Sequence, residues 1–219
     1  MHVIFDLDGT LADTHPGIAD AFGEAMREVL PHLAVPEFTH LIGPPVREVF
    51  RQALHCEDEN ILDSLNAAFR RHYDDRCWMN SRPYPKIPEL LSYLASQSVG
   101  CSVLTNKPAL ATSRILNHFR LRDHFTEVIS PDSRVPRFAR KSEGALHLLK
   151  LRNLDPTSTW LIGDSEDDAD AAFACGFNFA AAAYGYGHAH LQDRYPIHFT
   201  ISSIGNLHSH LQHRLTTHE

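Results

Sequence analysis

The chain has 219 residues, of which 43% are hydrophobic and 21% are charged, a composition typical of a globular enzyme with a substantial buried core. Its formal net charge of −7 argues against binding to nucleic acids or anionic membranes. No apolar stretch is long enough for a membrane span, no leader pattern begins the chain, and the cysteines form no C-x-x-C pair. We therefore expect a cytoplasmic protein with reduced thiols and no nucleic-acid or membrane partner, with monomer and homodimer both open.

The chain is also rich in histidine, with 16 such residues, many of them after residue 187. A zinc site in that region would lack a cysteine partner and an H-E-x-x-H pattern. We therefore expect these histidines to be solvated surface residues.

The first residues carry the most informative pattern. Val3-Ile4-Phe5 is a short apolar run, typical of a strand buried on both faces, and Asp6 and Asp8 follow it. Gly9 then allows a sharp turn. Two carboxylates about 4 Å apart repel each other by roughly 4 kcal/mol at an effective dielectric constant near 20. We therefore expect a positive group beside them.

The next segment is helical. Apolar residues recur at helical spacing over 16–30, 46–54 and 61–73, and no strand pattern interrupts them before residue 80. This segment is too long to be a loop, so we predict an inserted helical cap at 14–82. An Arg-Pro-Tyr-Pro stretch beginning at Arg82 then predicts a stiff, extended connection back to the core.

Strands and helices alternate through the remaining chain. We predict helices at 87–94, 112–119, 144–151 and 170–175, and strands at 99–104, 125–129, 159–163, 177–183 and, more weakly, 199–201. This alternation is typical of a parallel sheet with helices on both faces. We therefore predict a doubly wound α/β core formed by residues 1–13 and 83–219.

Polar residues follow several of these strands. They are Asp6, Asp8, Thr105, Asp164 and Asp168. The carboxyl ends of parallel strands meet at one edge of a sheet, so we expect these side chains to converge there, with Lys141 within reach. Carboxylates with a hydroxyl and an ammonium group suit Mg²⁺ and phosphoryl transfer, in which an aspartate attacks phosphorus and a second aspartate moves the proton.

These residues resemble the four ordered motifs of the haloacid dehalogenase-like (HAD) hydrolases. The motifs read Asp6-Leu-Asp-Gly-Thr-Leu, Leu104-Thr-Asn-Lys-Pro, Lys141 and Gly163-Asp-Ser-Glu-Asp-Asp. Leu41-Ile-Gly-Pro-Pro-Val-Arg-Glu-Val-Phe, Arg82-Pro-Tyr-Pro and Tyr184-Gly-Tyr-Gly further resemble the phosphoglycolate phosphatase branch, which carries a small helical cap. The resemblance covers nearly the whole chain.

The resemblance implies a Mg²⁺-dependent phosphatase that acts on a small phosphorylated metabolite through an aspartyl-phosphate. Asp6 would be the nucleophile and a metal ligand. Asp8 would be the acid and base, and would bind the metal through its carbonyl group. Asp164 would bind the metal, with Asp168 as an outer ligand or support.

Further implied roles concern the substrate. Thr105 and the Asn106 amide would bind the phosphoryl group, and Lys141 would neutralise it. Arg47 of the cap is the candidate for contacting the rest of the substrate, with a surface salt bridge as the alternative.

The sequence departs from the family pattern after Lys141, where Ser142 replaces the usual proline, and Arg140 is a rival for the role of this lysine. Other functions also stay open: a sugar phosphomutase, a pyrophosphatase or nucleotidase, and an inactive metabolite-binding module. Phosphoglycolate is the first candidate substrate by resemblance.

Overall fold

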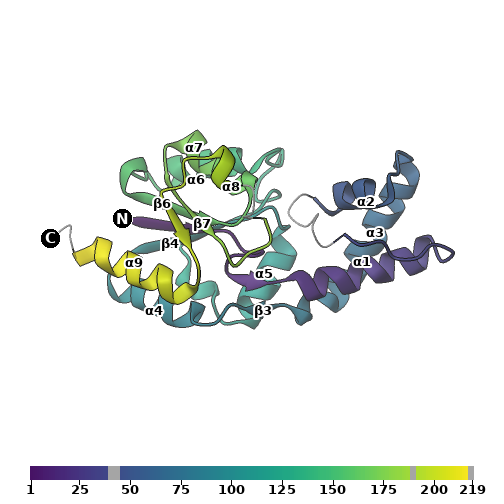
Figure 1. The fold of residues 1–219 in the computed structure, drawn as a ribbon, viewed down its shortest axis with the longest axis horizontal. Helices are drawn as coiled ribbons and strands as arrows, with labels where there is room; N and C mark the ends of the chain where they lie inside the picture. Colours follow the sequence, from purple (N-terminus) through teal and green to yellow (C-terminus); the bar gives the residue numbers. More distant parts are fainter. Residues whose placement is uncertain (39–44, 188–190, 217–219) are drawn as a thin grey trace.

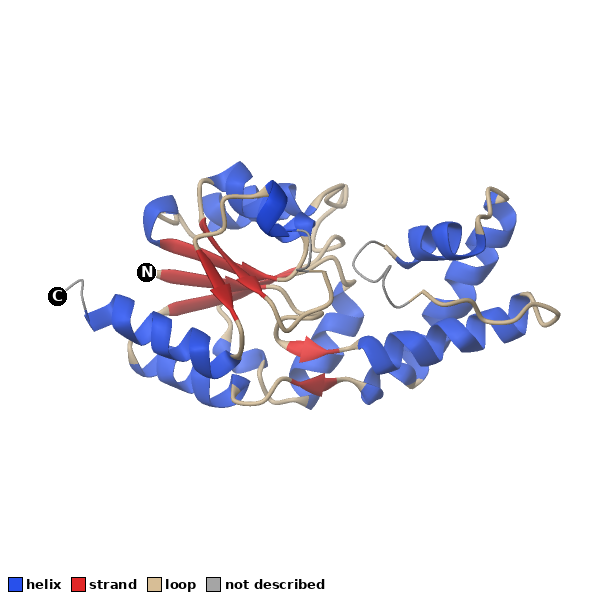
Figure 2. Cartoon of the chain, in the orientation of Figure 1, coloured by secondary structure: helices blue, strands red, loops and turns tan. Residues whose placement is uncertain are grey.

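The computed structural model describes residues 1–38, 45–187 and 191–216. Six strands form one sheet in the order β5-β4-β1-β6-β7-β8, and every neighbouring pair is parallel. The strands are β1 (His2–Phe5), β4 (Gly100–Leu104), β5 (Glu127–Ile129), β6 (Thr159–Gly163), β7 (Asn178–Ala182) and β8 (Phe199–Ile201). The predicted doubly wound α/β fold is confirmed (Figure 2).

Strand β1 lies in the middle of the sheet because its side chains are apolar on both faces. Val3 and Phe5 belong to one buried cluster and Ile4 to the other, and all three are fully buried. Alternate residues of a strand point to opposite faces, so three consecutive apolar residues require cover on both sides. This position also brings Phe5 beside Val103 of β4 and Ile162 of β6.

Helices cover both faces of the sheet (Figure 1). One face is covered by α4 (Ile87–Ser96), α5 (Ala109–His118) and α9 (Ile204–Thr216). The other face is covered by α6 (Lys141–Leu151) and α7 (Glu166–Cys175), with α8 (Leu191–Arg194) beside them. Short 3₁₀ helices, η3 (Arg122–His124) and η4 (Pro156–Ser158), precede β5 and β6. None of the helices in the described ranges is long and apolar enough to cross a bilayer.

The helical segment forms a second packed layer. It contains α1 (His15–Val29), α2 (Val46–Leu54), α3 (Glu59–Asp75) and the 3₁₀ helix η2 (Cys77–Asn80). Its core is aromatic: the Phe22 ring stacks between Phe38 and Phe50, at centroid distances of 3.8 and 4.1 Å. Ala111 of α5 joins the same buried cluster, so this layer packs against the sheet domain at that helix.

Three features differ from the sequence predictions. Helix α9 was not predicted, although Ile204, Leu207 and Leu211 repeat at helical spacing and are buried. Two short strands, β2 (Ala12–Asp13) and β3 (Arg82–Pro83), pair antiparallel where the chain leaves and re-enters the core. The sequence predicts an extended connector at Arg82–Pro83 and no element at Ala12–Asp13, because two residues are too short to show a strand period.

Two of the histidines after residue 187, which we predict to be solvated, are partly buried. His210 stacks on Phe199 at 3.9 Å and lies edge-on to Trp160, and His208 packs against Tyr93 at 4.5 Å. These rings join α9 to the sheet and to α4. His188, His190 and His218 lie outside the described residues.

Gly17 allows α1 to approach the backbone of η2. A Cβ atom at Gly17 would lie 2.3 Å from the Cys77 carbonyl oxygen, so Gly17→Ala should destabilise the protein by about 1–3 kcal/mol. Gly23→Ala on the same helix is the matched control, because its Cβ would meet only the flexible end of Arg27 at 3.4 Å. This control should stabilise the protein by about 0.5–1 kcal/mol through helix propensity. Urea unfolding measures both, and equal effects would contradict the proposed close contact.

Candidate active site

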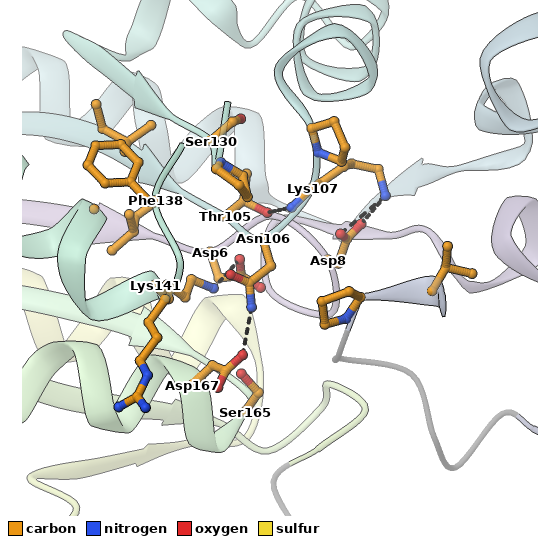
Figure 3. A pocket seen from close by; sticks show the side chains of 18 of the residues that line it. Asp6, Asp8, Thr105, Asn106, Lys107, Ser130, Phe138, Lys141, Ser165 and Asp167 are labelled. Carbon is orange, nitrogen blue, oxygen red and sulfur yellow. Dashed lines mark hydrogen bonds and ion pairs between the residues drawn. The ribbon is translucent and has the colours of Figure 1, made fainter. Parts of the chain in front are cut away.

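A cavity of about 990 Å³ lies where the carboxyl edge of the sheet meets the helical layer. We call it the central cavity. The sheet domain contributes acidic, hydroxyl and lysine side chains to its wall, whereas the helical layer contributes mainly Val46, Val49, Phe69, Arg70 and Tyr73. Figure 3 shows the side chains on the sheet side. Polar groups from distant parts of the sequence therefore face one shared space.

Asp6 lies directly after β1 and is held in place by the sheet. Its backbone N–H donates to the Ile162 carbonyl oxygen at 2.9 Å, which extends the β1–β6 ladder by one residue. The Lys141 ammonium, at the first residue of α6, lies 2.6 Å from Asp6 Oδ1 and 2.5 Å from Asp168 Oδ1. All three side chains are buried. Burial raises the pKa of Asp6, and Lys141 opposes this shift. Burial would lower the pKa of Lys141, but Asp168 and Asp6 raise it further than burial lowers it.

Asp164 follows β6 and is also buried. Its Oδ2 accepts hydrogen bonds from the backbone N–H groups of Tyr186, at 2.6 Å, and Gly187, at 3.3 Å. Burial and the neighbouring Asp168 raise the pKa of Asp164 to about 7. A side chain at Gly185 would collide with this carboxylate, since a Cβ there would lie 2.5 Å from Asp164 Oδ2. Glycine at this position therefore lets the loop after β7 close over Asp164.

Asp168 lies in the first turn of α7 and has two roles in the structure. Its Oδ2 accepts from the Ser165 backbone N–H at 3.1 Å and from the Ser165 hydroxyl at 2.6 Å, forming a capping box. Its other oxygen faces Lys141. Asp6, Asp164 and Asp168 thus form a group in which one carboxylate oxygen from each residue lies within 4.8 Å of the others. Three buried carboxylates with one lysine leave excess negative charge, and oxygen ligands of this kind fit Mg²⁺.

Asp8 faces a different lysine from Asp6 (Figure 3). The Lys107 ammonium donates to Asp8 Oδ1 at 2.8 Å and to Oδ2 at 3.1 Å, and the Thr14 hydroxyl donates to Oδ1 at 2.5 Å. Lys107 also lies 4.7 Å from the centre of the Tyr73 ring in the helical layer. Lys107 is buried, yet Asp8 and Tyr73 raise its pKa more than burial lowers it. The carboxylate of Asp8 is therefore not part of the three-carboxylate group.

Lys107 and Tyr73 were not predicted as site residues. Lys107 stands within the Thr105-Asn106-Lys107-Pro108 stretch, which was the available signal, but its partner could not be read from that stretch. Tyr73 was assigned only to a helix. The expected positive group beside Asp6 and Asp8 is present as two separate lysines.

Thr105 and Asn106 lie at the end of β4. The Thr105 backbone N–H donates to the Ile129 carbonyl oxygen at 3.0 Å, and its buried hydroxyl accepts from the Lys107 backbone N–H at 3.1 Å. The Asn106 side-chain amide donates to Asp167 Oδ2 at 2.7 Å. Both residues line the central cavity beside Asp6.

The two remaining predicted residues lie further out. Arg140 lines the cavity, but it is exposed, and Lys141 rather than Arg140 contacts Asp6 and Asp168. Arg47, on α2, pairs with Glu59 and, at 2.8 Å, with Asp63 of α3. Arg47 is not among the residues that line the cavity, so its position fits the alternative of a surface salt bridge.

Comparison with known protein families matches residues 3–182 to the haloacid dehalogenase-like hydrolases. The chain belongs to this family. The first-motif aspartates, Thr105, Lys141 and the acidic stretch after β6 all lie within the matched range.

Relatives of this HAD-family chain carry two kinds of name. It is 33% identical over 177 residues to the tyrosine-protein kinase PtkA of Mycobacterium tuberculosis, covering 80% of this chain and 59% of that protein. It is 30% identical over 180 residues to a phosphoglycolate phosphatase of Nitrosospira multiformis, covering 80% and 79% of the two chains.

Solved structures share the whole fold. A haloacid dehalogenase-like hydrolase from Streptococcus pneumoniae superimposes with a TM-score of 0.85 at 22% identity, covering 96% of this chain and 97% of the other. The structure of Mycobacterium tuberculosis PtkA gives a TM-score of 0.78 at 31% identity, covering 95% and 96%.

Removing the Lys141 cation should destabilise the protein. Lys141→Met leaves Asp6 and Asp168 buried without their ion-pair partner, which we expect to cost about 3–5 kcal/mol in metal-free buffer at neutral pH. Lys150→Met, at an exposed position of the same helix, should change stability by less than about 0.5 kcal/mol. Chemical unfolding with EDTA present measures both variants, and a similar small loss in each would refute the buried ion-pair cluster.

Proposed function

We propose that this protein is a Mg²⁺-dependent phosphatase that hydrolyses a small phosphomonoester through an aspartyl-phosphate on Asp6. The observation that carries the proposal is the separation of the first-motif aspartates, with Asp6 paired to Lys141 and Asp8 paired to Lys107. Two carboxylates in one cavity with different surroundings can take different roles. Family membership and the relatives named phosphoglycolate phosphatase add support.

In the first step, a carboxylate oxygen of Asp6 attacks phosphorus as the bond to the leaving oxygen breaks. Asp8 gives a proton to that oxygen. In the second step, Asp8 takes a proton from a water molecule that attacks the aspartyl-phosphate, which releases phosphate and restores Asp6. Thr105 and Asn106 hold the phosphoryl oxygens, and Lys141 neutralises their charge.

The metal site would use the carboxylates of Asp6 and Asp164 and the carbonyl of Asp8, with Asp168 as outer support. The fit rests on the group of three buried carboxylates, which outnumber the one lysine beside them. Burial first, and the neighbouring carboxylates second, raise the pKa values of Asp6 and Asp164, and a bound cation would oppose both shifts. When bound there, Mg²⁺ would neutralise charge on the phosphoryl group and help to orient it.

By resemblance alone, 2-phosphoglycolate is the first substrate to test, because the motifs resemble that branch and several relatives carry its name. A sugar phosphomutase, a pyrophosphatase or nucleotidase, and an inactive metabolite-binding module remain as rivals. The PtkA relatives suggest a further candidate, phosphorylation of tyrosine, although this chain spans only 59% of their length. Incubation with labelled ATP and a tyrosine-containing protein tests that candidate.

Phosphate release across a panel of phosphomonoesters, including 2-phosphoglycolate, tests the main proposal. We expect one compound to be cleaved far faster than the others. Asp6→Asn should abolish turnover, because the amide cannot form the covalent intermediate. Asp8→Asn should lower kcat by about 10²–10⁴-fold through loss of proton transfer.

Folding of each variant is checked by circular dichroism. If the folded wild-type protein releases no phosphate from any compound with Mg²⁺ or Mn²⁺, the phosphatase proposal fails, and mutase and binding assays follow.

Mg²⁺ alone should stabilise the protein. A metal concentration about 100 times the Kd adds about 2.7 kcal/mol to the free energy of unfolding. Asp164→Asn should remove most of this gain, whereas Asp170→Asn, at an exposed position on α7 outside the three-carboxylate group, should keep it. Thermal unfolding with increasing Mg²⁺ measures the effect. Equal stabilisation of the two variants would argue against the proposed site.

A further inference from the structure

The wall of the central cavity carries arginines that have no acidic partner at ion-pair distance. Arg70 of α3 and Arg137 and Arg140 of the loop 131–140 all line the cavity. Among the residues that the structure describes, no carboxylate lies within 4 Å of any of the three guanidinium groups. Other arginines of the helical layer do have such partners: Arg47, Arg51, Arg71 and Arg76 all pair with glutamate or aspartate.

Arg70 is the most informative of these arginines, because it is half-buried. Burial lowers the pKa of Arg70, and the nearby Arg137 lowers it further. Asp74 and Asp132 oppose this shift from a distance, but neither forms an ion pair with Arg70. A guanidinium group that is partly removed from water, close to a second one, is stabilised when an anion joins them.

The cavity's lysines lie beside the carboxylates of the proposed reaction site, so they do not serve a second anion. Lys107 is held by Asp8, and Lys141 is held by Asp6 and Asp168. Apolar side chains, including Val49, Phe69 and Phe138, line the same cavity. A ligand in this cavity therefore contacts apolar side chains as well as the arginines.

We propose that the leaving group of the substrate carries a second anionic group, and that Arg70 and Arg137 bind it across the boundary between the helical layer and the sheet domain. This inference rests on the proposed phosphatase function. Arg70 and Arg137 would then determine specificity in place of Arg47, whose guanidinium group forms ion pairs with Glu59 and Asp63.

The pair of arginines favours a second phosphate over a carboxylate as the bound group. Each guanidinium presents a planar fork of donors, and a phosphate dianion offers enough oxygens and charge for two forks. A cavity of about 990 Å³ is at the upper end of the usual range for small-molecule sites. The arginine pair therefore assigns the preferred substrate to small bisphosphorylated metabolites, ahead of 2-phosphoglycolate, whose second anion is a carboxylate.

A matched substrate series tests the assignment. The compounds are n-propyl phosphate, 3-(phosphonooxy)propanoate and propane-1,3-diyl bisphosphate, which share a three-carbon chain and differ only in the end group. Arg70→Gln and Arg137→Gln should each lower kcat/KM for the bisphosphate by about 10–100-fold, mainly through KM. Turnover of n-propyl phosphate should stay within about twofold, because it has no second anion.

Arg71→Gln is the control variant. Arg71 is the next residue on α3, but it is exposed and pairs with Glu28, so its loss should change none of the three rates. Equal losses for all three substrates in Arg70→Gln would overturn the anion subsite. A larger loss for the carboxylate compound than for the bisphosphate would overturn the assignment to bisphosphates.

The subsite can also be tested without turnover. Calorimetric binding of propane-1,3-diyl bisphosphate should be at least about 10-fold weaker in Arg70→Gln than in wild type or Arg71→Gln. If the wild type cleaves no compound but this difference is found, the phosphatase proposal fails while the subsite stands. If the affinity is the same in all three proteins, the subsite is refuted.

Discussion

The arrangement of the whole site depends on compensating the charge of carboxylates buried at one edge of the sheet. Asp6, Asp164 and Asp168 are buried close together, and their mutual repulsion would be costly without a cation. Lys141 meets two of them from the start of α6, and Lys107 meets Asp8 from the segment after β4. The sheet order and the helix starts must therefore both be correct before these acids can share one cavity.

The helical layer also contacts the charged side chains of the site. Tyr73 of α3 lies against the ammonium of Lys107, which in turn holds Asp8, and Ala111 of α5 packs within the aromatic cluster of the layer. The antiparallel strands β2 and β3 hold together the two segments through which the chain leaves the sheet domain and returns to it. The acid–base candidate is thus held by groups from both parts of the protein, and the cavity wall is shared between them.

Family membership alone does not determine which molecule accepts the phosphoryl group. Relatives with similar identity to this chain are named as a tyrosine kinase and as phosphoglycolate phosphatases, and the structure of the kinase shares the fold of this chain. The aspartate nucleophile that we propose, Asp6, would support transfer of a phosphoryl group to water or to another hydroxyl group. In our proposal, the surrounding wall, where Arg70 and Arg137 lie, selects the molecules that reach it.

The sequence by itself determined the α/β class, the helical segment before residue 80, and the convergence of Asp6, Thr105 and Asp164. These follow from local periodicity and from the rule that parallel strands end at one edge. Only the tertiary structure decided that Asp8 pairs with Lys107 and that α9 covers one face of the sheet. It also decided that Arg47 pairs with Glu59 and Asp63. The physical reason is that ion pairs and packing depend on distances between elements far apart in the chain, which no local pattern encodes.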